Sequence, residues 1–147
     1  MSEYTYNPVQ LVEPGQNVIL NDNIPCRRGY VLHREESGIV ILRGITNNCF
    51  ARYQVTFNGN IALPADATAI VPISVALAID GEPVQTSRAI YTPAAVDEYG
   101  NVTSTAIITV PRGCCFTVAV ENASAVVDGV APEINVQNAN MTVSRIA

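Results

Sequence analysis

Few residues in this 147-residue chain combine the types and spacing that catalysis requires. His33 is the only histidine, so a Ser-His-Asp or Cys-His arrangement must use it. It lies in residues 30–34, a segment with the composition of a strand, where a single histidine is usually packed or solvated and not a general base. The sequence therefore predicts no catalytic residue and a protein that is not an enzyme.

Four cysteines, Cys26, Cys49, Cys114 and Cys115, are the next candidates for chemistry. Adjacent residues of a strand point to opposite faces, and no C-x-x-C spacing occurs, so we expect no metal site. Chains made in a reducing compartment keep their thiols free. Free thiols are the main expectation, and a bridge between Cys26 and Cys49 after release into an oxidising medium is the alternative.

The carboxylates occur as sequence neighbours, Glu35 with Glu36 and Asp97 with Glu98, in polar segments typical of loops. Solvated loop charge is the simplest interpretation of such pairs. The sequence contains no phosphate-binding loop, dinucleotide fingerprint or calcium loop. We therefore predict no cofactor.

The composition is poor in charge. Charged residues make up 14% of the chain against a usual share of about 25%, while hydrophobic residues make up 48%. The net charge is −5, and the eight basic residues, all arginines, are scattered, so nucleic-acid binding is disfavoured. A surface with so little charge predicts that part of it is buried against other subunits.

The N-terminal residues show no basic region followed by an apolar stretch, and no apolar run approaches the ~20 residues of a membrane span. We expect a soluble protein made in a bacterial cytoplasm, with no membrane partner. If it acts outside the cell, we expect it to leave by lysis or as part of an assembly.

Along the chain, the apolar positions repeat with a period of two. Residues 51–58, 73–79 and 116–121 each alternate between apolar and polar or small side chains, which is typical of half-buried antiparallel strands. Turn signals such as Asp80-Gly81 separate the segments. The predicted strands cover residues 17–20, 29–33, 38–44, 49–58, 69–79, 84–91, 102–110, 114–122 and 132–146. This pattern predicts a sandwich or barrel.

Three further features complete the predicted organisation. Residues 1–16 are expected to form a polar N-terminal arm, and residues 17–147 a single domain. Residues 93–99 are expected to be a loop, not a helix. The apolar residues of the last segment change phase, so a bulge or turn is expected around residues 138–140, with the C-terminus held in the sheet.

Seven residues are predicted to lie at an interface between subunits. Small side chains on the second face of residues 73–79 allow close approach by another layer, and arginine pairs carboxylates at interfaces. Tyrosine combines an apolar body with a polar tip, so it suits an interface, or alternatively a carbohydrate platform. The predicted interface residues are Tyr6, Arg52, Ser74, Ala76, Ala78, Tyr91 and Tyr99.

The order of these segments resembles the tumour-necrosis-factor-like (TNF-like) jelly roll of bacterial and phage surface proteins. It is similar to the C-terminal domain of collagen-like spore-surface glycoproteins. The segments that carry the resemblance are YQVTF (53–57), VALAIDGEPV (75–84), FTVAVEN (116–122) and MTVSRIA (141–147). The chain also resembles small proteins of gut Firmicutes and their prophages, in HRE (33–35) and PRGCC (111–115).

The resemblance implies an all-β, TNF-like jelly-roll sandwich that forms a homotrimer. It implies a structural protein of the virion surface, a decoration or head-fibre subunit of a phage capsid, with the major capsid protein as a possible partner. The alternative is a glycan- or surface-binding trimer of a spore or cell surface. The collagen-like stalk of the spore proteins is absent from this sequence, which favours a particle component.

Overall fold

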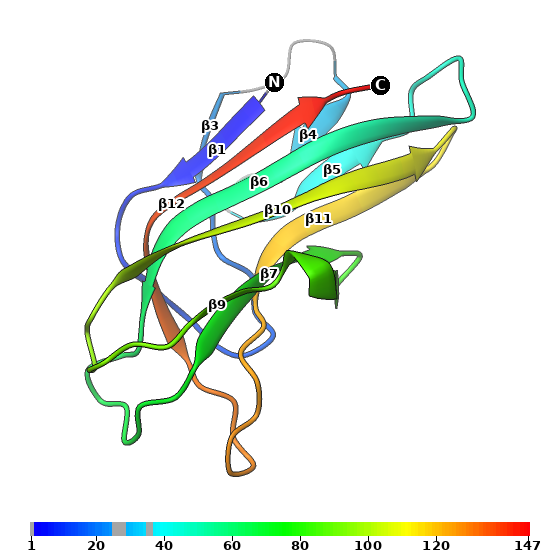
Figure 1. Ribbon diagram of the computed structural model, residues 1–147. Helices are drawn as coiled ribbons and strands as arrows, with labels where there is room; N and C mark the ends of the chain where they lie inside the picture. The colour runs from blue at the N-terminus through cyan, green and yellow to red at the C-terminus, as the bar shows by residue number, and fades with distance from the viewer. Residues whose placement is uncertain (1, 25–28, 35–36) are drawn as a thin grey trace.

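A computed structural model describes residues 2–24, 29–34 and 37–147 of the chain. The described residues form two antiparallel sheets packed face to face, with one short 3-10 helix, η1 (Gln85–Ser87) (Figure 1). This arrangement confirms the prediction of an all-β sandwich. Among the described residues, no helix is long and apolar enough to cross a membrane.

The first sheet, sheet A, has the strand order β10-β6-β12-β1-β3, and β2 pairs with β12 beside β1. Its strands are β1 (Ser2–Tyr6), β2 (Gln10–Val12), β3 (Asp22–Ile24), β6 (Phe50–Ala62), β10 (Gly100–Pro111) and β12 (Ile134–Arg145). The long strands β6, β10 and β12 lie next to one another, as Figure 1 shows, and form most of its surface.

The second sheet, sheet B, has the order β4-β5-β11-β7-β8, and β9 pairs with β7. Its strands are β4 (Val31–His33), β5 (Val40–Arg43), β7 (Ile73–Ile79), β8 (Glu82–Pro83), β9 (Ala89–Tyr91) and β11 (Cys115–Asn122). Residues 15–18 continue this sheet along β11, because Val18 N–H donates to the Val120 carbonyl at 2.7 Å and Asn17 bridges to Glu121.

Alternation builds the core between the two sheets. On β6, Tyr53, Val55 and Phe57 are fully buried, while their sequence neighbours point outward. Val118 and Val120 of β11 and Leu77 of β7 meet them from sheet B. Burying apolar surface at about 25 cal/mol per Å² makes this alternation the main source of stability.

The predicted turns also form. Asp80 and Gly81 both have positive φ, 51° and 86°, as a two-residue hairpin between β7 and β8 requires. The pairing of β12 with β6 shifts register between Gln137 and Asn140, and Asn138 has φ 54°, so the expected bulge is present. Residues 93–99 form a loop, as predicted.

The strand predicted over residues 69–79 begins only at Ile73, and two other segments also differ from expectation. Residues 1–16, expected to form an N-terminal arm, contribute β1 and β2 to sheet A, and Ser2 and Tyr4 are buried there. The sequence did not indicate these strands because their apolar alternation is very short. Residues 84–91 divide into η1 and β9. The Ser87 hydroxyl accepts from the Leu77 N–H at 3.0 Å and donates to the Val84 carbonyl at 2.6 Å, so a side chain replaces part of the ladder.

Candidate functional site

The broadest candidate surface is the outer face of sheet A, meaning the outward side chains of β6, β10 and β12. Every second residue of these strands points away from the core. Among those outward positions Arg52 is the only charged residue, and its guanidinium lies 4.8 Å from the centre of the Phe50 ring. The rest are mainly asparagine, glutamine, threonine and serine, with Ile107 left 65% exposed near the middle of β10.

Hydrogen bonds between side chains order this face. The Asn101 amide donates to Asn60 at 3.2 Å, Asn60 donates to Asn138 at 3.3 Å, and Asn138 donates to Asn7. This row of amides crosses β10, β6 and β12 and reaches the end of β1. Because the side chains are already held, a partner that binds them orders fewer rotamers.

The bulge of β12 makes the row possible. Without the one extra residue between Gln137 and Asn140, alternation would bring an apolar side chain to the outer face. With it, Asn138 stays outward and Ala139 is buried. The phase change in the sequence indicated the bulge, but not the row of amides that it completes.

The predicted interface residues do not come together. Arg52 lies on the outer face of sheet A. Tyr6 ends β1, half-buried against the core, opposite Ala139. Tyr91 and Tyr99 lie near one another beside the start of β10, since the Tyr91 hydroxyl donates to the Glu98 carbonyl at 3.4 Å. Burial raises the pKa of the Tyr99 hydroxyl above its ordinary value, and the Asp97 carboxylate raises it further.

Ser74, Ala76 and Ala78 were expected at a subunit interface, but each is only 1% exposed in the single chain. Both edges of β7 are paired, with β11 on one side and β8 and β9 on the other, and the Arg88 Nε donates to the Ser74 hydroxyl at 2.9 Å. Another copy would bury almost no further area on them. Their small size is explained by packing within this chain, so the interface expectation is revised for these three residues.

His33 is held in place by contacts with Ser37 and Tyr4. Its Nε2 lies 2.8 Å from the Ser37 carbonyl oxygen and must donate, and its ring stacks on Tyr4 with centroids 4.7 Å apart. Its Nδ1 is buried without a hydrogen-bond partner. Within the described ranges, no group of three or more His, Cys, Asp or Glu side chains could hold a metal ion.

The cysteines of the described segments, Cys49, Cys114 and Cys115, are free and exposed. Cys26, the fourth, lies outside the described residues, so the alternative of a Cys26–Cys49 bridge stays a prediction.

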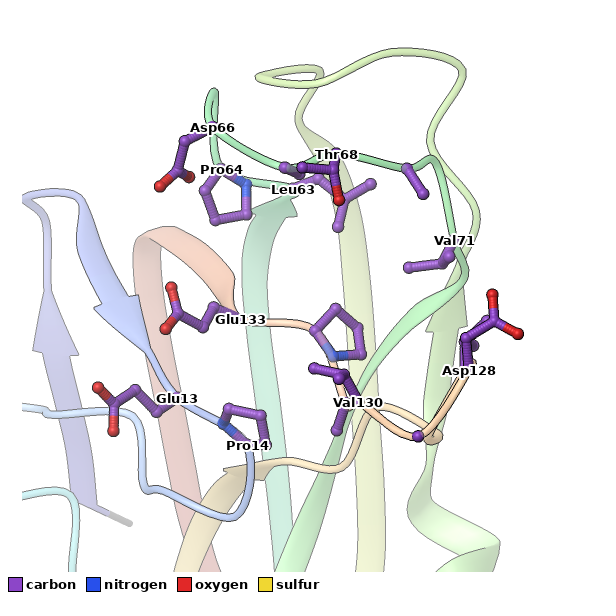
Figure 2. Close-up of a pocket in the computed structure, with 16 residues that line it drawn as sticks. Glu13, Pro14, Leu63, Pro64, Asp66, Thr68, Val71, Asp128, Val130 and Glu133 are labelled. Carbon is purple, nitrogen blue, oxygen red and sulfur yellow. The ribbon is translucent and has the colours of Figure 1, made fainter.

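A groove of about 920 Å³ opens at the end of the sandwich that carries the 125–131 loop (Figure 2). Its walls include Leu63, Val71 and Val130, and its lining carries no basic side chain. Figure 2 shows the carboxylates around it well separated, on loops from different parts of the chain. These carboxylates are Glu13, Asp66, Asp128 and Glu133. The groove is thus an acidic, partly apolar recess rather than a converging catalytic pair.

Comparisons with known proteins address the fold. No protein-family model matches the chain, and no curated protein matches it. The structure of Eiger TNF from S. frugiperda superposes with a TM-score of 0.61 at 10% identity, covering 100% of this chain and 92% of that one. The globular domain of the zebrafish complement 1qA protein gives 0.56 at 12% identity, covering 96% and 94%. The chain therefore has the jelly-roll fold of the TNF and C1q domains.

Proposed function

We propose that the protein is a non-enzymatic structural module that assembles as a homotrimer through the outer face of sheet A. The observation that carries the proposal is the low charge of that face: its three long strands place only Arg52 on it, and β1 beside them adds Glu3, whose carboxylate accepts from the Asn140 amide at 2.9 Å. Fully buried parts of interfaces are depleted of charged residues in the same way. Ile107 supplies an apolar contact on the same surface.

The chain has enough surface for an interface of ordinary size. The single chain exposes 7600 Å², close to the roughly 7,300 Å² that size scaling gives for a compact monomer of this mass. A stable interface covers about 800 Å² on each partner, and a protomer of a closed trimer makes two such contacts, so about a fifth of that surface would be covered. The outer face of sheet A is a continuous surface on which this area can be buried without refolding.

The setting that we propose is the surface of a particle, specifically decoration of a phage capsid. Closed threefold symmetry in the module matches threefold positions of an icosahedral shell. The sequence likeness to small prophage proteins favours this setting over a spore. A gene beside those for portal, protease and major capsid protein would support it, whereas a gene in a spore-coat cluster would contradict it.

A matched pair of variants tests the assembly. Ile107→Glu places a charge on the outer face of sheet A, and Leu32→Glu places the same charge at an exposed position of β4 in sheet B. Native mass spectrometry and sedimentation at micromolar concentration should show a trimer for the unchanged chain and for Leu32→Glu. Ile107→Glu should shift the protein to monomer. A monomeric unchanged chain, or equal dissociation of both variants, would contradict the proposal.

The row of amides favours a second candidate, a glycan-binding surface module. Neutral amides and hydroxyls such as Asn60, Asn101 and Thr103 present both donors and acceptors, the chemistry that sugar hydroxyls require. A glycan array would test it. Binding that is lost in Asn60→Ala and retained in Leu32→Glu would favour this candidate over self-assembly.

A further inference from the structure

The exposure of Cys49, Cys114 and Cys115 is unusual. Cysteine is among the residue types most often fully buried, because it behaves as a small apolar side chain. Here all three described cysteines face solvent, in a chain whose core is otherwise built by strict alternation. Packing therefore does not explain them.

Backbone hydrogen bonds hold these cysteines on one end of the sandwich. Cys49 precedes β6, and its carbonyl accepts from the Arg112 N–H at 2.9 Å. Gly44 N–H donates to the Cys114 carbonyl at 2.8 Å, and Gly113 N–H donates to the Gly44 carbonyl at 3.0 Å. Residues 65 positions apart in the sequence thus share one rigid junction between two loops, which we call the thiol cluster: Cys49, Cys114 and Cys115.

Two arginines lie beside the cluster. Arg43 is directly opposite Cys115 in the pairing of β5 with β11, a position that places two side chains of one face about 5 Å apart at Cβ. Arg112 belongs to the turn that carries Cys114 and is exposed. On the same face of β11, the Asp80 carboxylate is engaged by the N–H and hydroxyl of Thr117. The two charged side chains placed beside the cysteines are therefore both cationic, although the protein is acidic overall.

We propose that the thiol cluster is a thiol–disulfide exchange site that takes an anionic low-molecular-weight disulfide, of which oxidised glutathione is an example. A cysteine sulfur of the cluster loses its proton and attacks one sulfur of the disulfide. A new S–S bond joins the protein to half of the molecule, the old S–S bond breaks, and the released thiolate takes up a proton. The arginines attract the anionic disulfide, and the mixed disulfide caps the exposed thiol.

The test compares two probe disulfides on one protein. All variants carry Cys26→Ser, so that only the thiol cluster reacts. Stopped-flow rates are measured with dianionic dithiobis(nitrobenzoate) and with neutral dithiodipyridine, and the ratio of the two rates is compared between the folded chain and the chain unfolded in urea. The ratio should be about threefold to tenfold higher in the folded protein at low salt and should fall as salt is added.

Arg112→Glu should lower this ratio of rates roughly fivefold. The matched control is Arg34→Glu, because Arg34 is also exposed but lies in the turn between β4 and β5, and this variant should leave the ratio unchanged. Single Ser replacements of the three cysteines assign the signal, and peptide mass mapping after treatment with oxidised glutathione should locate the mixed disulfide on the cluster. Equal ratios in folded and unfolded chains, an equal effect of Arg34→Glu, or no glutathione adduct on the cluster would overturn the proposal.

Discussion

The junction that holds the thiol cluster depends on Gly44, and Gly44→Ala is the most direct perturbation of it. A Cβ at this position would lie 2.1 Å from the Pro111 carbonyl oxygen and 3.1 Å from that of Cys114. Both are backbone atoms, so no side chain can rotate away. Because ordinary contact begins at 3.4 Å, one of the two loops must move by more than 1 Å.

Such a shift breaks two backbone hydrogen bonds of Gly44. Its N–H donates to the Cys114 carbonyl, and its carbonyl accepts from the Gly113 N–H. A buried backbone group left without a partner costs about 1–3 kcal/mol, and Gly44 is buried. We expect a loss of about 3 kcal/mol in the free energy of unfolding. For a chain of this length that corresponds to a fall of roughly 6–12 °C in melting temperature.

Gly81→Ala is the matched control, since it makes the same chemical change in a different environment. Gly81 has φ 86° and no atom within 4 Å of the added Cβ, so only backbone strain opposes the substitution. That strain costs about 1–2 kcal/mol. Urea unfolding of the two variants should therefore rank Gly44→Ala as clearly the more damaging. If Gly81→Ala lost as much stability or more, the steric reasoning at the junction would be refuted.

Two further predictions concern buried polar groups. Tyr53→Phe removes a hydroxyl that donates to the Arg43 carbonyl at 2.5 Å. We expect the free energy of unfolding, measured with urea, to fall by about 1–2 kcal/mol, with an unchanged circular dichroism spectrum. No measurable loss would show that this hydrogen bond does not stabilise the fold. Burial raises the pKa of the Glu121 carboxyl, and the Glu82 carboxylate raises it further. The stability that the protonated group contributes is present at acidic pH and is lost as the pH rises through the raised pKa. Glu121→Gln should therefore increase the melting temperature relative to the unchanged chain more at pH 7 than at pH 4, and an equal increase at both would contradict the assignment.

The sequence predicted the elements that depend on local alternation and turn chemistry. The inward residues of β6, the Asp80-Gly81 hairpin and the bulge of β12 all follow from a period of two and from the residues that interrupt it. Where a tertiary contact replaces a local rule, the prediction differed. β7 starts at Ile73 because the preceding residue, Pro72, has no N–H for the ladder. η1 forms where the Ser87 hydroxyl bonds the Leu77 N–H of β7 and the Val84 carbonyl.

The candidate surfaces were less predictable, because they depend on which strands become neighbours. The polar face of residues 51–58 was visible in the sequence, but the neutral surface appears only when β6 lies between β10 and β12. The small residues Ser74, Ala76 and Ala78 of β7 did indicate close approach by another layer, but the residues that bury them belong to the same chain. Nothing in the spacing of Cys49 and Cys114 indicated that hydrogen bonds at the ends of β6 and β10 would bring them together.

The two proposals use different parts of the molecule. Assembly depends on outward side chains along the length of sheet A, whereas thiol exchange depends on loops at one end and on Arg43 and Cys115 of sheet B. A copy that covers Ile107 near the middle of β10 need not cover the turn that follows Pro111. Capping of the thiols would then leave the neutral face free, and a monomeric protein would retain its exchange chemistry. If copies of the protein assemble as proposed, its exposed cysteines risk random cross-linking between copies. Capping of the thiol cluster by small anionic disulfides would suppress that cross-linking without weakening the assembly.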